Sequence, residues 1–266
     1  MTLPPLFSHH FPTFVKDSFN NDVNLYWYHP EFSQSRYPPG QGISEACTLI
    51  CLLVAQRISQ RNVLIYDVEN CPELTVIMAE AMVEGNATHA WIISQKLIPH
   101  PYLNTEEALQ YGGRSLTMLK EWKFHVFHEK IERSLYNNIK SFLLDWYKES
   151  LSTNLFMLLI TCGRTVLFIF QEITYKVRFL FINYLHKNDV SFHPQVTLFD
   201  SHGHSTIKHP NRGLVVAQTS IEKLESLCNW YSHEIVNNCY NMEAYQYELA
   251  FLYPDNLCKC SNCFKD

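Results

Sequence analysis

The segment of residues 155–170, LFMLLITCGRTVLFIF, restricts the possible folds of this chain more than any other. A helix that crosses a membrane needs roughly 20 uninterrupted apolar residues. This run is broken by Arg164 and is followed closely by Glu172 and Lys176. It therefore predicts two strands inside a hydrophobic core and no membrane association. A chain of 266 residues is long enough to bury such a core.

The overall composition is that of a globular protein. Hydrophobic residues make up 47% of the chain and charged residues 18%, which does not fit a disordered chain. A formal net charge of -5 gives no reason to expect a nucleic-acid partner. The first residues, MTLPPLFSHHFPTF, lack the basic start and apolar run of a secretory signal. We therefore expect a cytoplasmic or nuclear protein.

The order of the expected elements indicates the fold class. Helices are expected from Ser44 to about residue 58 and at 71–87, 105–113, 129–150 and 220–235. Strands are expected at 119–128, 155–161, 165–170, 196–200 and 213–218, while 62–67 and 243–254 remain open between two readings. Helices come first and strands of antiparallel type gather later, which predicts an α+β fold with a helix packed on a sheet.

The same pattern divides the chain. We expect a single domain over residues 1–257, in which residues 1–40 form an extended N-terminal segment and residues 171–195 an insertion between two strands. Residues 258–266 form a cysteine-rich tail.

A cysteine at the start of the first expected helix is the first candidate for chemistry. If Ser44 caps that helix, Cys47 is its third residue and lies in the first turn. Unpaired backbone N–H groups and the positive end of the helix dipole stabilise a thiolate at this position. Cys51 lies one turn further, beyond that field. Taken alone, a cysteine here is more often a packing residue than a nucleophile.

A glutamine precedes this cysteine by six residues. At that separation the Gln41 amide can fold back beside the Cys47 sulfur and donate to a developing oxyanion. A donor of this kind contributes about 3–4 kcal/mol to lowering the barrier of acyl transfer.

The motif FDSHGH, residues 199–204, offers a base and a group to orient it. On a strand, Asp200 and His202 project from one face, about 6.6 Å apart along the chain, so the carboxylate can hold the imidazole and fix its tautomer. His204 is the competing base. Gly203 indicates that the strand ends there, so His204 is predicted to be a rim residue. A histidine at a strand end is often a spectator, but its combination with Gln41 and Cys47 favours a catalytic site.

Three cysteines crowd the tail, where Cys258, Cys260 and Cys263 form the run CKCSNC. A structural zinc site needs four nitrogen or sulfur ligands, and one is missing locally. A flexible tail, or the edge of a longer protein, is therefore the favoured interpretation. A zinc site, and with it a zinc-linked regulatory protein, remains the alternative.

Gln41, Cys47 and the later strand with its histidine together resemble the papain-like cysteine proteases. Papain itself has its histidine first and an asparagine later, whereas here the acid precedes the histidine by two residues. That Asp-x-His order is similar to the herpesvirus tegument deubiquitinases, the ubiquitin-fold-modifier proteases and the autophagin proteases. The stretch LFDSHGH most resembles the tegument group.

This resemblance implies a papain-like fold and a set of roles. Cys47 would be the nucleophile, His202 the general base and acid, Asp200 its orienting partner and Gln41 the oxyanion donor. The implied activity is that of a thiol isopeptidase that removes ubiquitin or a ubiquitin-like protein, with no metal or organic cofactor. Trp27, Tyr28 and Trp91 are candidates to line a channel for the modifier's tail, although core packing accounts for them equally well.

The alternative is a catalytically inactive papain-like fold that serves as a protein-interaction module. Residues 1–40 and 171–195 would then be its docking surfaces.

Overall fold

A single antiparallel sheet organises the chain in the computed structural model, which describes residues 7, 11–149, 151–172 and 194–255. Its eight strands follow the order β1-β2-β7-β6-β5-β4-β8-β3. The strands are β1 (Phe14–Phe19), β2 (Val23–Tyr28), β3 (Leu119–Phe127), β4 (Leu155–Thr161), β5 (Arg164–Phe170), β6 (Gln195–Asp200), β7 (Val215–Ser220) and β8 (Tyr247–Pro254). With helices on both faces of this sheet, the predicted α+β fold is confirmed.

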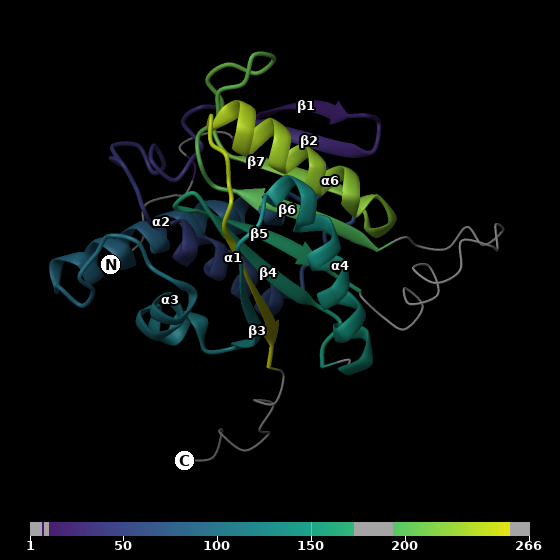
Figure 1. Ribbon diagram of the computed structural model, residues 1–266. Helices are drawn as coiled ribbons and strands as arrows, with labels where there is room; N and C mark the ends of the chain where they lie inside the picture. Colours follow the sequence, from purple (N-terminus) through teal and green to yellow (C-terminus); the bar gives the residue numbers. More distant parts are fainter. Residues whose placement is uncertain (1–6, 8–10, 150, 173–193, 256–266) are drawn as a thin grey trace.

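The helices form two layers, one on each face of the sheet (Figure 1). One layer contains α1 (Cys47–Arg61), α2 (Pro72–Ser94), α3 (Thr105–Tyr111) and the short η1 (Gly113–Leu116). The other contains α4 (Ile131–Glu149), η2 (Ile221–Lys223), α6 (Leu224–Trp230) and the π-helical η3 (Tyr231–Cys239). Because both faces are covered, the central strands are apolar on both sides.

Strand β4 shows this double burial. Phe156 and Leu158 pack with α1 and α2, whereas Met157 and Leu159 pack with α4 and α6. The strand is joined to β5 by a tight turn in which Cys162 and Gly163 both have positive φ. The prediction of two core strands within residues 155–170 is therefore confirmed.

The N-terminal region differs from the prediction, because residues 14–28 form a hairpin within the sheet. Strand β1 pairs with β2, and β2 pairs with β7. Apolar and aromatic side chains in β2 are buried on both faces, which hides the alternation that reveals a strand. Trp27 and Tyr28 are consequently core residues, 2% and 1% exposed, so of the two roles left open from the sequence they have core packing and not channel lining; Trp91 is 52% exposed.

The second helix also differs, since α2 runs on to Ser94 instead of ending at Gly85 and Asn86. At Gly85 a Cβ would lie 2.6 Å from Ile50 Cγ1 of α1. Gly85 is therefore where the two helices approach closely, and not a helix terminus. Asn86 is buried and its amide donates to the backbone carbonyls of Gln34 and Tyr37.

The remaining predicted elements were placed with smaller errors. Residues 220–235 form η2, α6 and part of η3 instead of one helix, and the Ser220 side chain makes no capping hydrogen bond. Residues 243–254 contain a strand, and 62–67 form a connector. Most of the expected insertion at 171–195 lies outside the described residues. Within the described part of the chain, no helix is both long and apolar enough to cross a membrane.

Candidate active site

The candidate residues meet where the start of α1 faces the end of strand β6. Cys47 is the first residue of α1, and Asp200 is the last residue of β6, two positions before His202. Asp200 is fully buried, and Cys47 and His202 are 5% and 7% exposed. The structure therefore brings Cys47, His202 and Asp200 together in an enclosed site.

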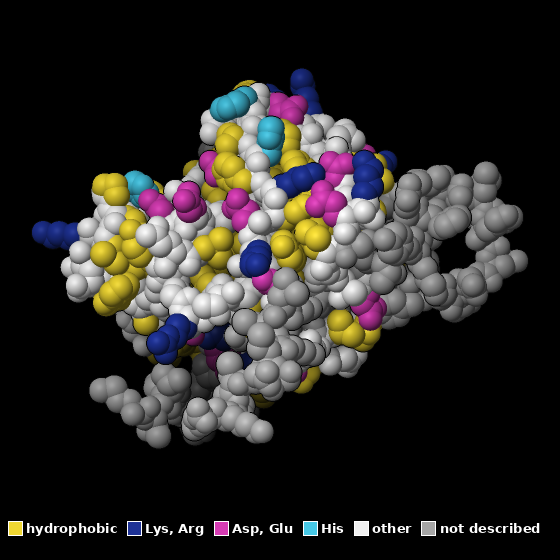
Figure 2. Space-filling model, turned by 90° about the horizontal axis from the view of Figure 1, so that it is seen from below, with side chains coloured by type: hydrophobic (Ala, Val, Ile, Leu, Met, Phe, Trp, Pro, Cys, Tyr) yellow, Lys and Arg dark blue, Asp and Glu magenta, His cyan; other side chains and the backbone are white. Residues whose placement is uncertain are grey.

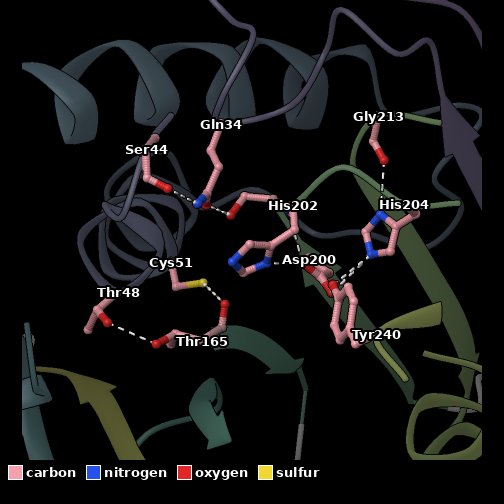
Figure 3. A network of polar contacts seen from close by, with 11 residues as sticks. Gln34, Ser44, Thr48, Cys51, Thr165, Asp200, His202, His204, Gly213 and Tyr240 are labelled. Carbon is pink, nitrogen blue, oxygen red and sulfur yellow. Dashed lines mark hydrogen bonds and ion pairs between the residues drawn. The ribbon is translucent and has the colours of Figure 1, made fainter. Parts of the chain in front are cut away.

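The His202 ring lies between the carboxylate and the thiol. Its Nδ1 is 2.6 Å from Asp200 Oδ1, and the His202 backbone N–H donates to the same oxygen at 3.0 Å (Figure 3). Because a carboxylate accepts at Nδ1, that nitrogen carries a proton and Nε2 is left for the hydrogen bond with Cys47. This is the orientation that a Cys–His pair needs.

The electrostatics of the pair favour the charged forms of both groups. Burial opposes ionisation of Cys47, but the hydrogen bond and charge of His202 outweigh it and lower the pKa of the thiol. Burial also opposes protonation of His202, yet the charge and hydrogen bond of Asp200 raise the pKa of the ring to about 9. Both shifts therefore favour a thiolate–imidazolium pair over a neutral thiol beside a neutral imidazole.

The neighbouring cysteine is different. Burial raises the pKa of Cys51 well above its usual value, and the nearby Cys47 and Asp200 add to this effect. Its Sγ donates to the Thr165 carbonyl at 3.6 Å. Cys51 therefore stays a protonated packing residue.

The start of α1 departs from the predicted cap. Ala46, and not Ser44, is the N-cap residue, so Cys47 is the first helical residue instead of the third. The Ser44 hydroxyl accepts from the Ala46 N–H and donates to Asn86 Oδ1. Cys47 still lies in the first turn, where unpaired backbone N–H groups and the helix dipole favour a thiolate.

The prediction that His204 is a rim residue is wrong. Strand β6 ends at Asp200, and the chain folds back through a backbone bridge between His204 and Arg212. His204 is consequently buried, with Nε2 at 3.1 Å from Asp200 Oδ2 and Nδ1 at 2.9 Å from the Gly213 carbonyl. The extended geometry assumed from the sequence would have kept these groups far apart.

Gln41 is not joined to the other three residues by a hydrogen bond within the described chain. Its side-chain amide donates to the carbonyl of the adjacent Gly42 at 3.4 Å. The structure thus places Gln41 in the loop ahead of α1 and leaves its role as oxyanion donor a proposal.

A buried glutamine that the sequence did not reveal connects the two halves of the site. Gln34 donates from Nε2 to the Ser44 carbonyl at 2.8 Å and accepts from the Ser201 hydroxyl at 2.6 Å (Figure 3). Its backbone N–H also donates to the Ser201 carbonyl. Ser201 separates Asp200 from His202, so Gln34 links the loop before α1 to the histidine-bearing segment. Nothing in the local pattern PEFSQSRY marks such a residue.

Gly213, whose carbonyl accepts from His204, is confined by the chain around it. A Cβ at this position would overlap the carbonyl oxygens of His29 and Phe32. The Gly213→Ala variant should therefore lose about 1–3 kcal/mol of unfolding free energy, because backbone oxygens cannot move aside as side chains do. Urea denaturation measures this loss. Gly42→Ala is the matched control, since a Cβ there meets nothing within 4 Å; equal midpoints for the two variants would contradict the prediction.

Metal ligands are not clustered in the described residues: they contain no group of three or more His, Cys, Asp or Glu side chains placed to hold an ion. The predicted alternative, a zinc site at Cys258, Cys260 and Cys263, lies outside the described residues.

The site has a cysteine at a helix start and a histidine just beyond the end of a strand of the antiparallel sheet, which is close to the layout expected from the papain-like resemblance. No family model matches the chain, and no curated protein matches it.

The solved structures that are similar to it include the following two. The ubiquitin-specific protease encoded by the murine cytomegalovirus tegument protein M48, in complex with a ubiquitin-based suicide substrate, is 13% identical over 83% of this chain and 82% of that chain, with a TM-score of 0.46. The Pseudomonas avirulence protein AvrPphB is 11% identical over 79% of this chain and 95% of that chain, with a TM-score of 0.37. Likeness at this level assigns neither an activity nor a substrate to this chain.

Proposed function

We propose that this chain is a cysteine protease of the deubiquitinase type, which removes ubiquitin or a ubiquitin-like protein through an acyl-enzyme on Cys47. The observation that carries the proposal is the His202 ring, held by Asp200 at 2.6 Å and hydrogen-bonded to the Cys47 thiol. A nucleophile, a base and a group that orients the base are the three parts that thiol-based acyl transfer requires.

The reaction follows from this geometry. The Cys47 thiolate attacks the carbonyl of an amide or isopeptide bond, and the His202 imidazolium gives its proton to the departing amine. The neutral ring then takes a proton from water as the water oxygen attacks the thioester carbonyl. The C–S bond breaks, the acyl group leaves as a free carboxylic acid, and the Cys47 thiolate and His202 imidazolium are restored. The Cys47 backbone N–H at the start of α1 and a side-chain amide, from Gln41 or the buried Gln34, are the candidate donors to the oxyanion.

The choice of a ubiquitin-type substrate rests on the resemblance of LFDSHGH to the tegument deubiquitinases. The surface fits a protein partner better than a nucleic acid. On the face shown in Figure 2, Lys and Arg side chains are scattered among Asp and Glu side chains instead of gathering into one basic patch. We further propose that residues 1–257 act as one domain in the cytoplasm or nucleus.

The second candidate function is an inactive fold that binds other proteins. The observation in its favour is the enclosure of the site, because Cys47 and His202 are almost completely buried. A substrate tail reaches the sulfur only if the surrounding loops open. Docking through the 1–40 region would then use the surface left by the β1–β2 hairpin, since the aromatic residues of β2 itself are in the core.

A ubiquitin probe with a C-terminal propargyl amide separates the two functions. An active enzyme should form a covalent adduct that is one ubiquitin heavier, and the Cys47→Ser variant should form none. Probes built on other ubiquitin-like proteins identify the preferred modifier. Binding of unmodified ubiquitin-type proteins without an adduct on any probe would favour the interaction module.

A further inference from the structure

The Asp200 carboxylate uses only half of its hydrogen-bonding capacity on the catalytic histidine. Oδ1 accepts from the His202 ring and backbone, whereas Oδ2 faces His204 Nε2 at 3.1 Å and the Tyr240 hydroxyl at 2.9 Å (Figure 3). The reaction described above makes no use of this second oxygen. His204 and Tyr240 therefore bind the carboxylate oxygen that does not contact the His202 ring.

Counting protons defines the charge of the second ring. The Gly213 carbonyl can only accept, so His204 Nδ1, at 2.9 Å, carries a proton. The single Tyr240 hydroxyl proton points to Asp200 Oδ2 at 2.9 Å, and the Tyr240 oxygen is 3.1 Å from His204 Nε2. Without a proton, the lone pair of His204 Nε2 would repel the lone pairs of the Asp200 carboxylate. All these contacts are satisfied together when Nε2 is also protonated and the ring is an imidazolium.

We propose that His204 is a positioning residue that acts as a second cation on Asp200 and thereby sets the pH range in which the His202–Cys47 pair works. The proposal rests on the function proposed above. A carboxylate shared between two imidazolium rings attracts the His202 proton less strongly than a carboxylate that serves one ring. His202 can then release its proton more readily to the departing amine.

Among the groups around His204, Asp200 is the charged side chain that is hydrogen-bonded to the ring. Tyr240 stacks on the ring and Trp27 meets it edge-on, with centroids 5.8 and 5.6 Å away. Further out, the Arg164 guanidinium lies over Tyr240, and His209 stacks on Trp27 while pairing with Asp17, which also pairs with Lys208. Tyr231 lies near Tyr240, the Cys239 sulfur accepts from the Ser205 backbone N–H, and Arg212 pairs with the His204 backbone. Asp200 is the member of this set whose charged atoms are hydrogen-bonded to His204.

The His204→Gln variant tests the proposal, because glutamine can donate a hydrogen bond but carries no charge. Without the cation on His204, the negative charge of Asp200 would act fully on His202 and Cys47. A negative charge stabilises the His202 imidazolium and disfavours the Cys47 thiolate. The pH at which Cys47 becomes reactive toward iodoacetamide, followed on its peptide by mass spectrometry, should rise by roughly one unit. The alkaline limb of ubiquitin-substrate cleavage should rise in the same direction.

His209→Gln is the matched control, since His209 stacks on Trp27 without contacting Asp200, and its profiles should stay in place. If the His204→Gln rates fall while the pH of iodoacetamide reactivity and the alkaline limb of cleavage both stay unchanged, the proposal is overturned and His204 is only a structural support. Iodoacetamide needs no ubiquitin recognition, so this readout remains informative even if the ubiquitin probes do not react.

A second measurement covers the case in which His204→Gln does not fold. In the unmodified protein with ¹⁵N-labelled histidine, the His204 ring is identified by its NOEs to Trp27 and Tyr240. At pH 7 both of its ring nitrogens should have the chemical shifts of protonated nitrogens. One unprotonated ring nitrogen would overturn the proposal.

Discussion

The His202→Ala variant should cleave a fluorogenic ubiquitin-type substrate about 10² to 10⁴-fold more slowly than the unmodified chain, a loss of roughly 3–5 kcal/mol in transition-state stabilisation. Alanine removes the group that protonates the departing amine as an acid and activates water as a base. It also removes the charge that lowers the pKa of Cys47, so less of the nucleophile is ionised at neutral pH. The measurement is kcat/KM of both proteins at pH 7.

The control for this variant is His233→Ala, which truncates an exposed histidine of η3 on the same chain. Its kcat/KM should equal that of the unmodified chain. If His202→Ala keeps full activity while His204→Ala is inactive, the roles of the two histidines are exchanged. His202 would then not be the base.

The central strands were predictable from the sequence because their burial on both faces leaves a long apolar signal. Residues 155–170 show this, since a broken apolar run of this length has few other uses in a globular chain. The same double burial hid β2. VNLYWY is a run of mostly apolar and aromatic residues without alternation, preceded by a proline-rich start. One of its two neighbours in the sheet is the adjacent β1, but the other, β7, lies almost two hundred positions away. Local patterns carry no information about such a partner.

The residues of the candidate site also differ in how far local sequence patterns reveal them. Cys47 was found because a helix start is a local geometry. Asp200 and His202 were paired by a two-residue strand repeat that the structure does not show, because β6 ends at Asp200 and its carboxylate accepts the His202 backbone N–H across a turn. The contacts of His204 and Gln34 were missed, since both depend on where the chain returns after a turn. His204 reaches Asp200 because the 201–214 segment folds back to pair with itself, and Gln34 reaches Ser201 across 167 positions of the sequence.

Asp200 should be the residue whose loss costs the fold most, because it is a fully buried carboxylate that serves two histidines and a tyrosine. Asp200→Ala should lower the unfolding free energy by about 3–5 kcal/mol, since it leaves buried cationic and polar groups without their partner. Asp200→Asn should lose less, because an amide still offers hydrogen bonds although it lacks the charge. Urea unfolding followed by tryptophan fluorescence at pH 7 measures both variants.

The loss of unfolding free energy in Asp200→Ala should depend on pH in a defined direction. His204 and His202 hold the pKa of Asp200 well below its usual value despite burial. A carboxyl group with a lowered pKa stabilises the fold above its unfolded pKa of about 3.9, and this stabilisation disappears as the pH falls through the folded value. The difference between the unmodified chain and Asp200→Ala should therefore narrow in acid. Asp22→Ala is the control, a surface acid bonded to Lys223 and Ser226, and its midpoint should change far less. If Asp22→Ala and Asp200→Ala lose equal unfolding free energy at pH 7, the buried contacts of Asp200 do not hold the two histidines in place. Other contacts would then have to position them.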